Sequence, residues 1–435
     1  NMRFTVQFPS FCRFALGLLL AGCVGLPPAS FPAANPANSL PTTDGGTPRG
    51  TQAQSSGQAN RSATEAAAGG QPSMISSGRA PTRLALLLPI TSSAEARTIR
   101  DGFQFALDQL PEGVRPRLQV YDTSKSTAIE QLAAARTDGN SFAVGPLLRN
   151  EVAAVAASGV VPLPTLALNA LVGDARSPAN LYQFALSPED EARAIAQRIL
   201  SDGFKRGVAL TPSGEWGNRV ATAFSQEFRA GGGTLLAQAN YDTAAADYSA
   251  GIKQVLGLNE SDARLRRLQT ITGARFDFEP RRRSDIQFIF AAASQPTHAR
   301  LLRPQISFQY AGDIPTYMTS PSFTPGGKEA NDDLNGALLP GMPWLLPDTS
   351  LDALRSAAQQ DSTNTSWQSQ YFAFGFDAAQ LALGIAVAGR DTARVRVTGL
   401  TGKLSLDSAG RVRREQTWAR MRDGEAQLLT NSARN

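Results

Sequence analysis

Histidine and cysteine are nearly absent from this chain of 435 residues. It has one histidine, His298, and two cysteines, Cys12 and Cys23. A zinc site or a Ser-His-Asp triad would have to use that single histidine, and the sequence offers no cluster of metal-ligating residues and no glycine-rich phosphate loop. We expect His298 to be a solvated residue at the start of a helix. The sequence therefore predicts a protein that is not an enzyme and has no metal and no cofactor.

The chain also lacks a strong net charge. Its N-terminal part lacks a long apolar run. The formal net charge is only +5, which argues against a dedicated nucleic-acid partner. The apolar block at residues 14–20 contains seven residues, whereas a membrane-spanning helix needs about twenty. With 42% hydrophobic residues, the rest of the chain has enough apolar side chains for sizeable cores.

The N-terminus has the pattern of a secretory signal. Arg3 and Arg13 accompany the short apolar block, and Leu-Ala-Gly follows directly before Cys23. This arrangement resembles the lipobox of bacterial lipoproteins, in which the cysteine becomes the first mature residue and carries the lipid. The resemblance implies a signal peptide at 1–22, lipidation of Cys23 and, because Val24 follows the cysteine, sorting to the outer membrane. An ordinary signal peptide with an incidental cysteine is the alternative.

A low-complexity stretch follows the cysteine. Residues 24–80 consist mainly of Pro, Ala, Gly, Ser, Thr, Gln and Asn, a composition that buries too little apolar surface to fold. We expect residues 23–82 to be a lipid-anchored linker. As a flexible coil it would span roughly 40 Å, and fully extended it would reach about 190 Å.

From Arg83 onward, strand and helix patterns alternate. Residues 84–88 form an apolar run of strand length, and Ile99, Phe103 and Leu107 then recur at helical spacing. The alternation continues and predicts an α/β fold in which parallel sheets are flanked by helices. Further strands are expected at 118–121, 142–144, 163–166, 181–186, 207–210, 234–237, 286–291, 393–397, 404–406 and 417–421.

Helix-start signals appear at two places in this part of the chain. Ser187 and Pro188 precede three acids at 189–191, a pattern typical of a capped helix start. Ser261 is a second candidate cap, for a helix in an insertion between Leu256 and Asp285.

Several segments resemble known proteins. The Gly145-Pro146 turn, the unit at 207–233 and the C-terminal segment from Gly399 look like the type I periplasmic-binding-protein fold. That fold implies two lobes within 83–435, with lobe 1 at about 83–188 and 321–388 and lobe 2 at about 189–320 and 389–435. Segments that together resemble the LppC-type lipoproteins, the penicillin-binding-protein activators, lie at 182–192, 278–290, 311–320, 342–346 and 399–418.

The second resemblance implies an outer-membrane lipoprotein that faces the periplasm and regulates peptidoglycan synthesis. Such a protein binds and activates a class A bifunctional penicillin-binding protein. Well-studied members carry a helical-repeat domain before the two-lobed domain, and residues 24–80 show neither a repeat of about 34 residues nor helical periodicity.

A periplasmic solute-binding protein for an amino acid or another small ligand is the alternative function. Ligands of open parallel sheets bind at the carboxyl ends of the strands. The candidate polar contacts there are Thr91, Ser92, Ser93, Asn169 and Asp377. Leucines occupy much of the same edge, and an apolar edge does not compensate the desolvation of a zwitterion. These leucines are Leu147, Leu148, Leu166 and Leu168. Roles as caps or loop residues are the alternative for all five polar residues, and the sequence favours them.

Two features are candidate contacts for a protein partner. The first comprises Arg281, Arg282 and Arg283, whose guanidinium groups suit an acidic surface. Internal pairing with Glu279 and Asp285 is the alternative for them. The second is Trp344, which suits an interface anchor, with hinge or core packing as the alternative.

Overall fold

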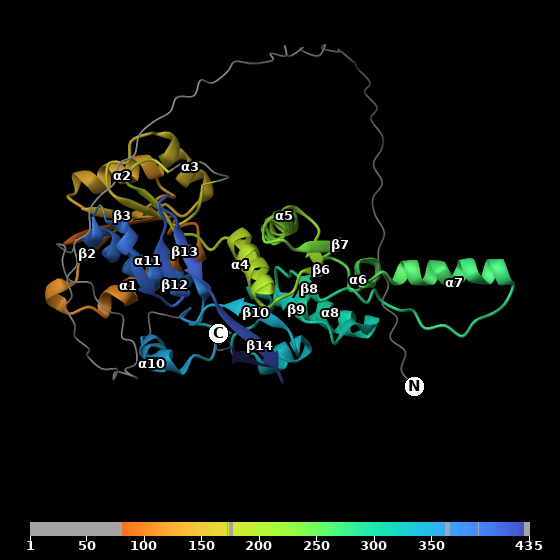
Figure 1. Cartoon of the computed structure of the whole chain (residues 1–435). Helices are drawn as coiled ribbons and strands as arrows, with labels where there is room; N and C mark the ends of the chain where they lie inside the picture. The colour runs from red at the N-terminus through yellow and green to blue at the C-terminus, as the bar shows by residue number, and fades with distance from the viewer. Residues whose placement is uncertain (1–80, 172, 174–176, 362–365, 390, 430–435) are drawn as a thin grey trace, which may run out of the picture. The chain divides into compact units, whose positions relative to one another are not determined.

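A five-stranded parallel sheet forms the centre of the first lobe (Figure 1). The structure is a computed structural model that describes residues 81–171, 173, 177–361, 366–389 and 391–429. Cys23, the signal sequence and most of the predicted linker lie outside these residues. In the order β2-β1-β3-β4-β5, the strands are β1 (Arg83–Leu88), β2 (Arg117–Asp122), β3 (Phe142–Val144), β4 (Thr165–Ala167) and β5 (Leu181–Gln183).

Helices cover both faces of this sheet, which explains why β1 is an unbroken apolar run. On one face lie α2 (Ala128–Thr137) and α3 (Arg149–Ala157). On the other lie α1 (Ala94–Asp108) and α11 (Gln370–Ala388). The strand and helix predicted at 84–88 and after it are confirmed.

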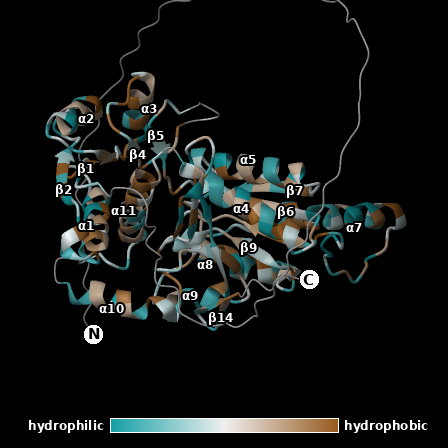
Figure 2. Ribbon diagram, turned by 60° about the vertical axis from the view of Figure 1, so that its left-hand side comes forward, coloured by the Kyte–Doolittle hydropathy of each residue, from teal (hydrophilic) through white to brown (hydrophobic). Residues whose placement is uncertain are grey.

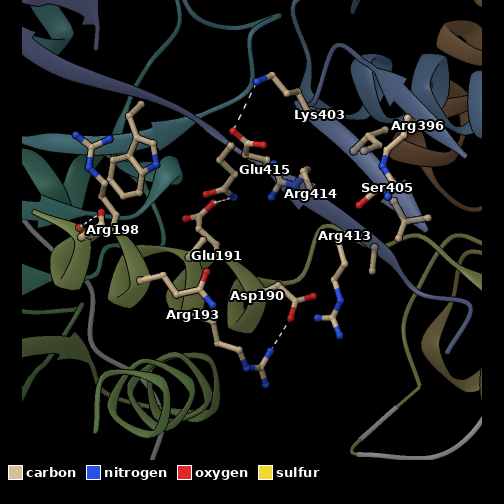
Figure 3. A pocket seen from close by; sticks show the side chains of 18 residues that line it. Asp190, Glu191, Arg193, Arg198, Arg396, Lys403, Ser405, Arg413, Arg414 and Glu415 are labelled. Atoms are coloured by element: carbon tan, nitrogen blue, oxygen red, sulfur yellow. Dashed lines mark hydrogen bonds and ion pairs between the residues drawn. The ribbon is translucent and has the colours of Figure 1, made fainter. Parts of the chain in front are cut away.

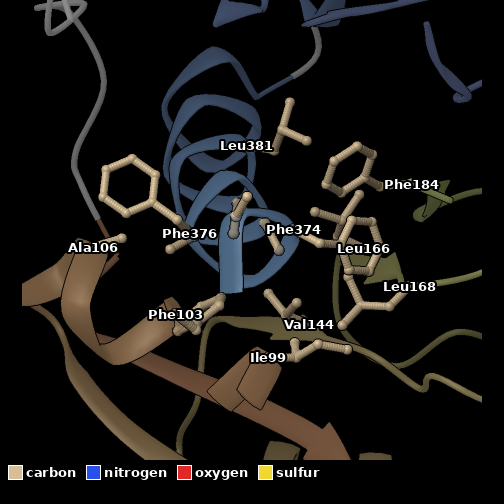
Figure 4. Packing of buried hydrophobic residues seen from close by; sticks show 14 of the residues in the cluster. Ile99, Phe103, Ala106, Val144, Leu166, Leu168, Phe184, Phe374, Phe376 and Leu381 are labelled. Carbon is tan, nitrogen blue, oxygen red and sulfur yellow. The ribbon is translucent and has the colours of Figure 1, made fainter. Parts of the chain in front are cut away.

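The helices α1 and α11 approach each other closely through two glycines. A Cβ on Gly102 would lie 2.1 Å from the carbonyl oxygen of Phe372, and one on Gly375 would lie 2.0 Å from that of Ile99. Among the described residues, α11 is the one helix long and apolar enough to cross a membrane, with a mean hydropathy of 1.5. Most of it is buried in the first-lobe core, where Phe374, Phe376 and Leu381 pack (Figure 4).

A seven-stranded mixed sheet forms the second lobe, in the order β15-β14-β10-β9-β8-β6-β7. Its strands are β6 (Arg206–Pro212), β7 (Thr234–Tyr241), β8 (Phe288–Ala291), β9 (Thr316–Met318), β10 (Leu338–Gly341), β14 (Thr417–Arg422) and β15 (Glu425–Leu428). One face packs on α4 (Pro188–Ser201) and α5 (Glu215–Ala230), and the other on α6 (Ser249–Leu256) and α8 (Pro296–Ile306). Two short helices, α9 (Lys328–Asn331) and α10 (Asp352–Gln360), lie in the connections after β9 and β10.

The helix α7 (Leu258–Thr272) extends away from the second lobe, and residues 273–287 return beside it (Figure 1). Figure 2 shows hydrophobic residues along this exposed helix, and Ile271 is 72% exposed. Ser261 lies inside α7, since the helix begins at Leu258, so the prediction that it caps the helix is wrong. Its hydroxyl instead accepts a hydrogen bond from the backbone N–H of Arg281 at 3.2 Å, which links the helix to the returning segment.

A small antiparallel sheet of β11 (Arg396–Thr398), β12 (Lys403–Leu406) and β13 (Val412–Glu415) changes the expected lobe boundaries. Leu404 and Leu406 of this sheet pack into the first-lobe core, although residues 389–435 were expected in lobe 2. Conversely, β10 was expected in lobe 1, and it pairs with β9 and β14 in the second sheet. The chain therefore crosses between the lobes near residues 184–188, 341–344 and 415–417.

Candidate functional site

Glu191 lies beside the first and the third of the crossings between the lobes, in the first turn of α4 and within reach of Gln416. As predicted, α4 starts with a cap: Ser187 Oγ accepts a hydrogen bond from the Asp190 N–H at 3.1 Å, and Pro188 occupies the first turn. The sequence interpretation assigned all three acids of this turn to capping. Glu191 instead points inward and is only 6% exposed.

The Glu191 carboxylate joins α4 to two other segments. It accepts hydrogen bonds from the Ser320 N–H at 2.7 Å and the Ser320 hydroxyl at 2.6 Å, just after β9. It also accepts one from Gln416 Nε2 at 3.5 Å, in the third crossing. Glu191 therefore fixes the start of α4 against both segments, and two hollows adjoin it, one on each side.

The first hollow is the cleft between the lobes, with a volume of about 340 Å³. Much of its lining is apolar and comes from Ile99, Leu147, Leu168, Trp216, Met342 and Phe374. Polar groups in it already bond to the protein: Asn169 Nδ2 donates to the Leu147 carbonyl at 3.0 Å, and the Ser320 hydroxyl is held by Glu191. Of the four leucines predicted at this edge, Leu147 and Leu168 line the cleft, while Leu166 is buried and Leu148 is on the surface.

Residues 91–93, in the loop after β1, are not among those that line this cleft. The Thr91 hydroxyl donates to Asp122, and Ser92 Oγ bonds Ser124 Oγ at 2.8 Å. Ser93 caps α1 by accepting from the Ala96 N–H at 3.1 Å. These three residues therefore have the cap and loop roles that were the alternative to ligand binding.

Asp377 is also removed from the cleft, because its side chain is fully buried. Its carboxylate accepts hydrogen bonds from the Leu400 N–H at 2.7 Å, the Thr401 N–H at 2.7 Å and the Thr401 hydroxyl at 2.6 Å. Burial raises the pKa of Asp377 to about 6, against the lowering effect of these hydrogen bonds. The prediction of a cleft ligand contact is wrong for Asp377, which instead ties α11 to the turn before β12.

The second hollow is charged and has a volume of about 660 Å³. Figure 3 shows Arg396, Ser405 and Arg413 along one wall, which is the outer face of the small sheet, and Asp190 and Arg193 on α4 along the other. Side chains alternate between the two faces of a strand. The residues on the outer face are therefore polar, while Leu404 and Leu406 between them enter the core.

Arg414 and Gln416 lie between the two hollows. Arg414 lines both, and its Nη1 donates to the Thr401 carbonyl at 3.4 Å. Burial lowers the pKa of Arg414, an effect that the charges of Glu191 and Asp377 oppose. Gln416 is 8% exposed, and its Oε1 has no hydrogen-bond partner among the described residues. This side of Glu191 therefore contains a desolvated cation and a vacant acceptor.

The basic residues predicted as partner contacts are partly paired within the protein. Arg282 binds Asp313 at 2.6 Å, and Arg283 binds Asp285 at 3.0 Å, whereas Arg281 is exposed. Internal pairing, the alternative, therefore applies to Arg283 with Asp285, and Arg282 pairs with a residue that the sequence did not indicate.

Trp344 is 3% exposed, so the expectation of an interface anchor is wrong. Its Nε1 donates to the Trp367 carbonyl at 2.6 Å, and its ring stacks on Phe372 with centroids 5.8 Å apart. This is the core packing named as the alternative.

His298 stands in the first turn of α8, as predicted, but it is half-buried against the ring of Tyr241 with centroids 6.4 Å apart. Within the described ranges, no group of three or more His, Cys, Asp or Glu side chains is placed to hold a metal ion.

The two lobes, with parallel sheets covered by helices and a cleft between them, define a type I periplasmic-binding-protein-like fold. Solved structures agree: the chain superposes on full-length LpoA from Haemophilus influenzae with a TM-score of 0.63 and 23% identity, covering 81% of this chain and 60% of that one. It also superposes on a putative branched-chain amino acid ABC transporter protein from Chromobacterium violaceum, with a TM-score of 0.57 and 25% identity over 78% of this chain and all of the other.

Residues 74–424 match the family described as LppC putative lipoprotein, and the chain belongs to that family. Among its relatives is the penicillin-binding protein activator LpoA of Vibrio antiquarius, 32% identical over 352 residues, or 78% of this chain. That of Photobacterium profundum is 28% identical. The chain spans 57% and 55% of the length of these relatives.

Proposed function

We propose that this chain is a lipoprotein that binds a class A bifunctional penicillin-binding protein and activates peptidoglycan synthesis. The family match over residues 74–424 carries the proposal, because the relatives it groups with are penicillin-binding protein activators. The matched region corresponds to one part of such proteins: a structure described as the LpoA C-domain from Haemophilus influenzae, a regulator of PBP1A, is covered over its whole length.

The cleft supports regulation of a protein partner over solute capture. An amino acid would bring a charged carboxylate and a charged amine into a hollow whose walls are largely apolar. Two of its polar side chains, Asn169 and Ser320, already bond to the protein. Desolvating two charges without new partners is unfavourable. The cleft therefore favours a role in binding a protein over a role in solute capture.

A reconstituted assay tests this function. The purified chain is added to its cognate class A synthase, and the rates of glycan polymerisation and peptide crosslinking are measured with lipid-linked precursor. We expect at least one rate to rise with saturable dependence on the chain. Binding without any rate change would reduce the protein to a scaffold, and a rise in melting temperature with an amino acid would instead support solute capture.

The anchor is part of the proposal. We propose that lipid on Cys23 holds the chain at the outer membrane facing the periplasm, with residues 23–82 as the linker. Cys23→Ala should abolish labelling by a fatty-acid analogue and release the chain from the membrane fraction, while Cys12→Ala, the matched control, leaves both unchanged. Continued labelling of the Cys23 variant would show that another residue carries the lipid.

A further inference from the structure

The charged hollow has more cations than acids in its lining. Six basic and three acidic side chains face it. The acids are already engaged: Asp190 pairs with Arg193 at 2.5 Å, Glu415 pairs with Lys403 at 3.7 Å, and Glu191 is held by Ser320. Arg198 and Arg413 also pair with carboxylates outside the lining, Asp202 at 3.0 Å and Asp407 at 2.8 Å. The surplus positive charge therefore rests on Arg396 and Arg414, and it favours an anionic occupant.

A row of three side chains on the outer face of the small sheet concentrates this surplus. Arg396 pairs in register with Ser405, and Ser405 with Arg413, so two guanidinium groups flank one hydroxyl across adjacent strands. Arg413 has Asp407 at 2.8 Å. Arg396 Nη1 donates to the carbonyls of Ala393 and Val395 at 2.9 Å, and no carboxylate of the described chain pairs with it.

The chemistry of the hollow favours a peptide over a free phosphate. Arginine forks bind carboxylates and phosphates alike, so the row alone does not distinguish them. The vacant Oε1 of Gln416 needs an N–H or O–H donor, which the backbone N–H groups of a peptide provide. Asp190 and Glu415 in the same lining also repel a compact double charge more than a carboxylate.

We propose that this hollow, between α4 and the sheet of β11, β12 and β13, binds an acidic peptide segment of the synthase. The inference rests on the proposed function for the identity of the partner. Carboxylates of the segment bind Arg396 and Arg413, and Ser405 donates its hydroxyl between them. A backbone N–H of the segment reaches Gln416 after a small shift of that buried side chain.

An affinity titration tests the site. The full chain, as wild type and as Arg396→Glu/Arg413→Glu, is titrated with the periplasmic part of the cognate synthase. The matched control is Arg264→Glu/Arg267→Glu, which changes the net charge equally on the exposed helix α7. We expect the hollow variant to bind at least about tenfold more weakly, since it places like charges opposite the acidic segment, and the control to stay within about twofold.

The outcomes of this titration distinguish the proposed function from the proposed binding site. No binding by the wild-type chain overturns the proposed function and this inference together. Wild-type binding that the hollow variant retains, or that the α7 control loses to the same extent, overturns the inference alone. Because charge reversal can perturb folding, Arg396→Gln/Arg413→Gln is measured as well, with the melting temperature of each variant, and it should weaken binding by several fold.

A competition experiment distinguishes the ligand chemistry. A synthetic hexaglutamate peptide should displace the synthase from the wild-type chain at concentrations where inorganic phosphate of equal ionic strength does not. Displacement by phosphate that equals or exceeds displacement by the peptide would contradict a peptide site.

Discussion

The two hollows beside Glu191 have Glu191 and Arg414 in common but differ in chemistry. The cleft between the lobes is largely apolar, and its Asn169 amide bonds to the protein itself. The hollow between α4 and the small sheet is charged, with surplus cations and a vacant acceptor. The proposal for the charged hollow implies that a two-lobed fold can keep its cleft as structure and place recognition on another surface.

The largest expected effect comes from replacing Glu191, which lines both hollows. Glu191→Ala leaves Ser320 without its acceptor and removes one of the opposite charges near Arg414, and loss of one partner in such a buried network costs roughly 3–5 kcal/mol. Chemical denaturation measures this change in the free energy of unfolding. The neighbouring Asp190→Ala, which removes only an exposed ion pair, should cost less than about 1 kcal/mol. Equal effects of the two variants would contradict the role given to Glu191.

The wall of the charged hollow should respond to pH through Asp377. Its pKa is raised to about 6 by burial, from an ordinary 3.8, so the folded state holds the proton more tightly than the unfolded state. Its contribution to stability is therefore fully present below about pH 4 and is lost as pH rises to about 6, a change of roughly 3 kcal/mol.

Asp377→Asn removes this titration. The stability of the wild-type chain relative to Asp377→Asn should therefore increase as pH falls from 7 to 4, as measured by denaturation at each pH. A difference that stays constant across this range would show that the carboxylate titrates alike in both states.

The salt dependence of synthase binding distinguishes a contact at the charged hollow from a contact at an apolar surface. If the charged hollow carries the partner contact, synthase binding should weaken by roughly threefold to tenfold between about 0.05 and 0.3 M salt. Salt screens the attraction between partly exposed charges of opposite sign. Arg396→Gln/Arg413→Gln should flatten this dependence. A salt-independent affinity would point to an apolar contact such as the exposed face of α7.

The smallest effect is expected from the cleft. Leu147→Trp fills part of it from a half-buried position and should change synthase affinity by less than about twofold. A loss of tenfold or more would place the partner contact in the cleft and reverse the comparison.

Local signals predicted much of the fold. The apolar run of β1 and the Ser187-Pro188 cap of α4 are readable because their patterns are contiguous in sequence. The helix α11 was not predicted, because it is buried on most sides and so lacks a polar stripe of helical period. Because this helix was not predicted, the burial of its Asp377 was not expected either.

The charged hollow was not predicted either, since its walls come from residues about 200 positions apart. A signal did exist in the alternation of Lys403, Ser405, Arg413 and Glu415 with inward-facing residues along β12 and β13. Only the fold brings that face against α4. Glu191 was missed for a different reason: acids in a first helical turn usually serve the helix start, and its partners Ser320 and Gln416 are distant in sequence.

Hydrogen–deuterium exchange of the chain, alone and in complex with its cognate synthase, tests the central claim most directly. The account predicts slower exchange at residues 190–201 and 396–416, which form the walls of the charged hollow, with residues 147–169 of the cleft and 258–272 of α7 unchanged. Protection confined to the cleft or to α7, with the hollow unchanged, would contradict it.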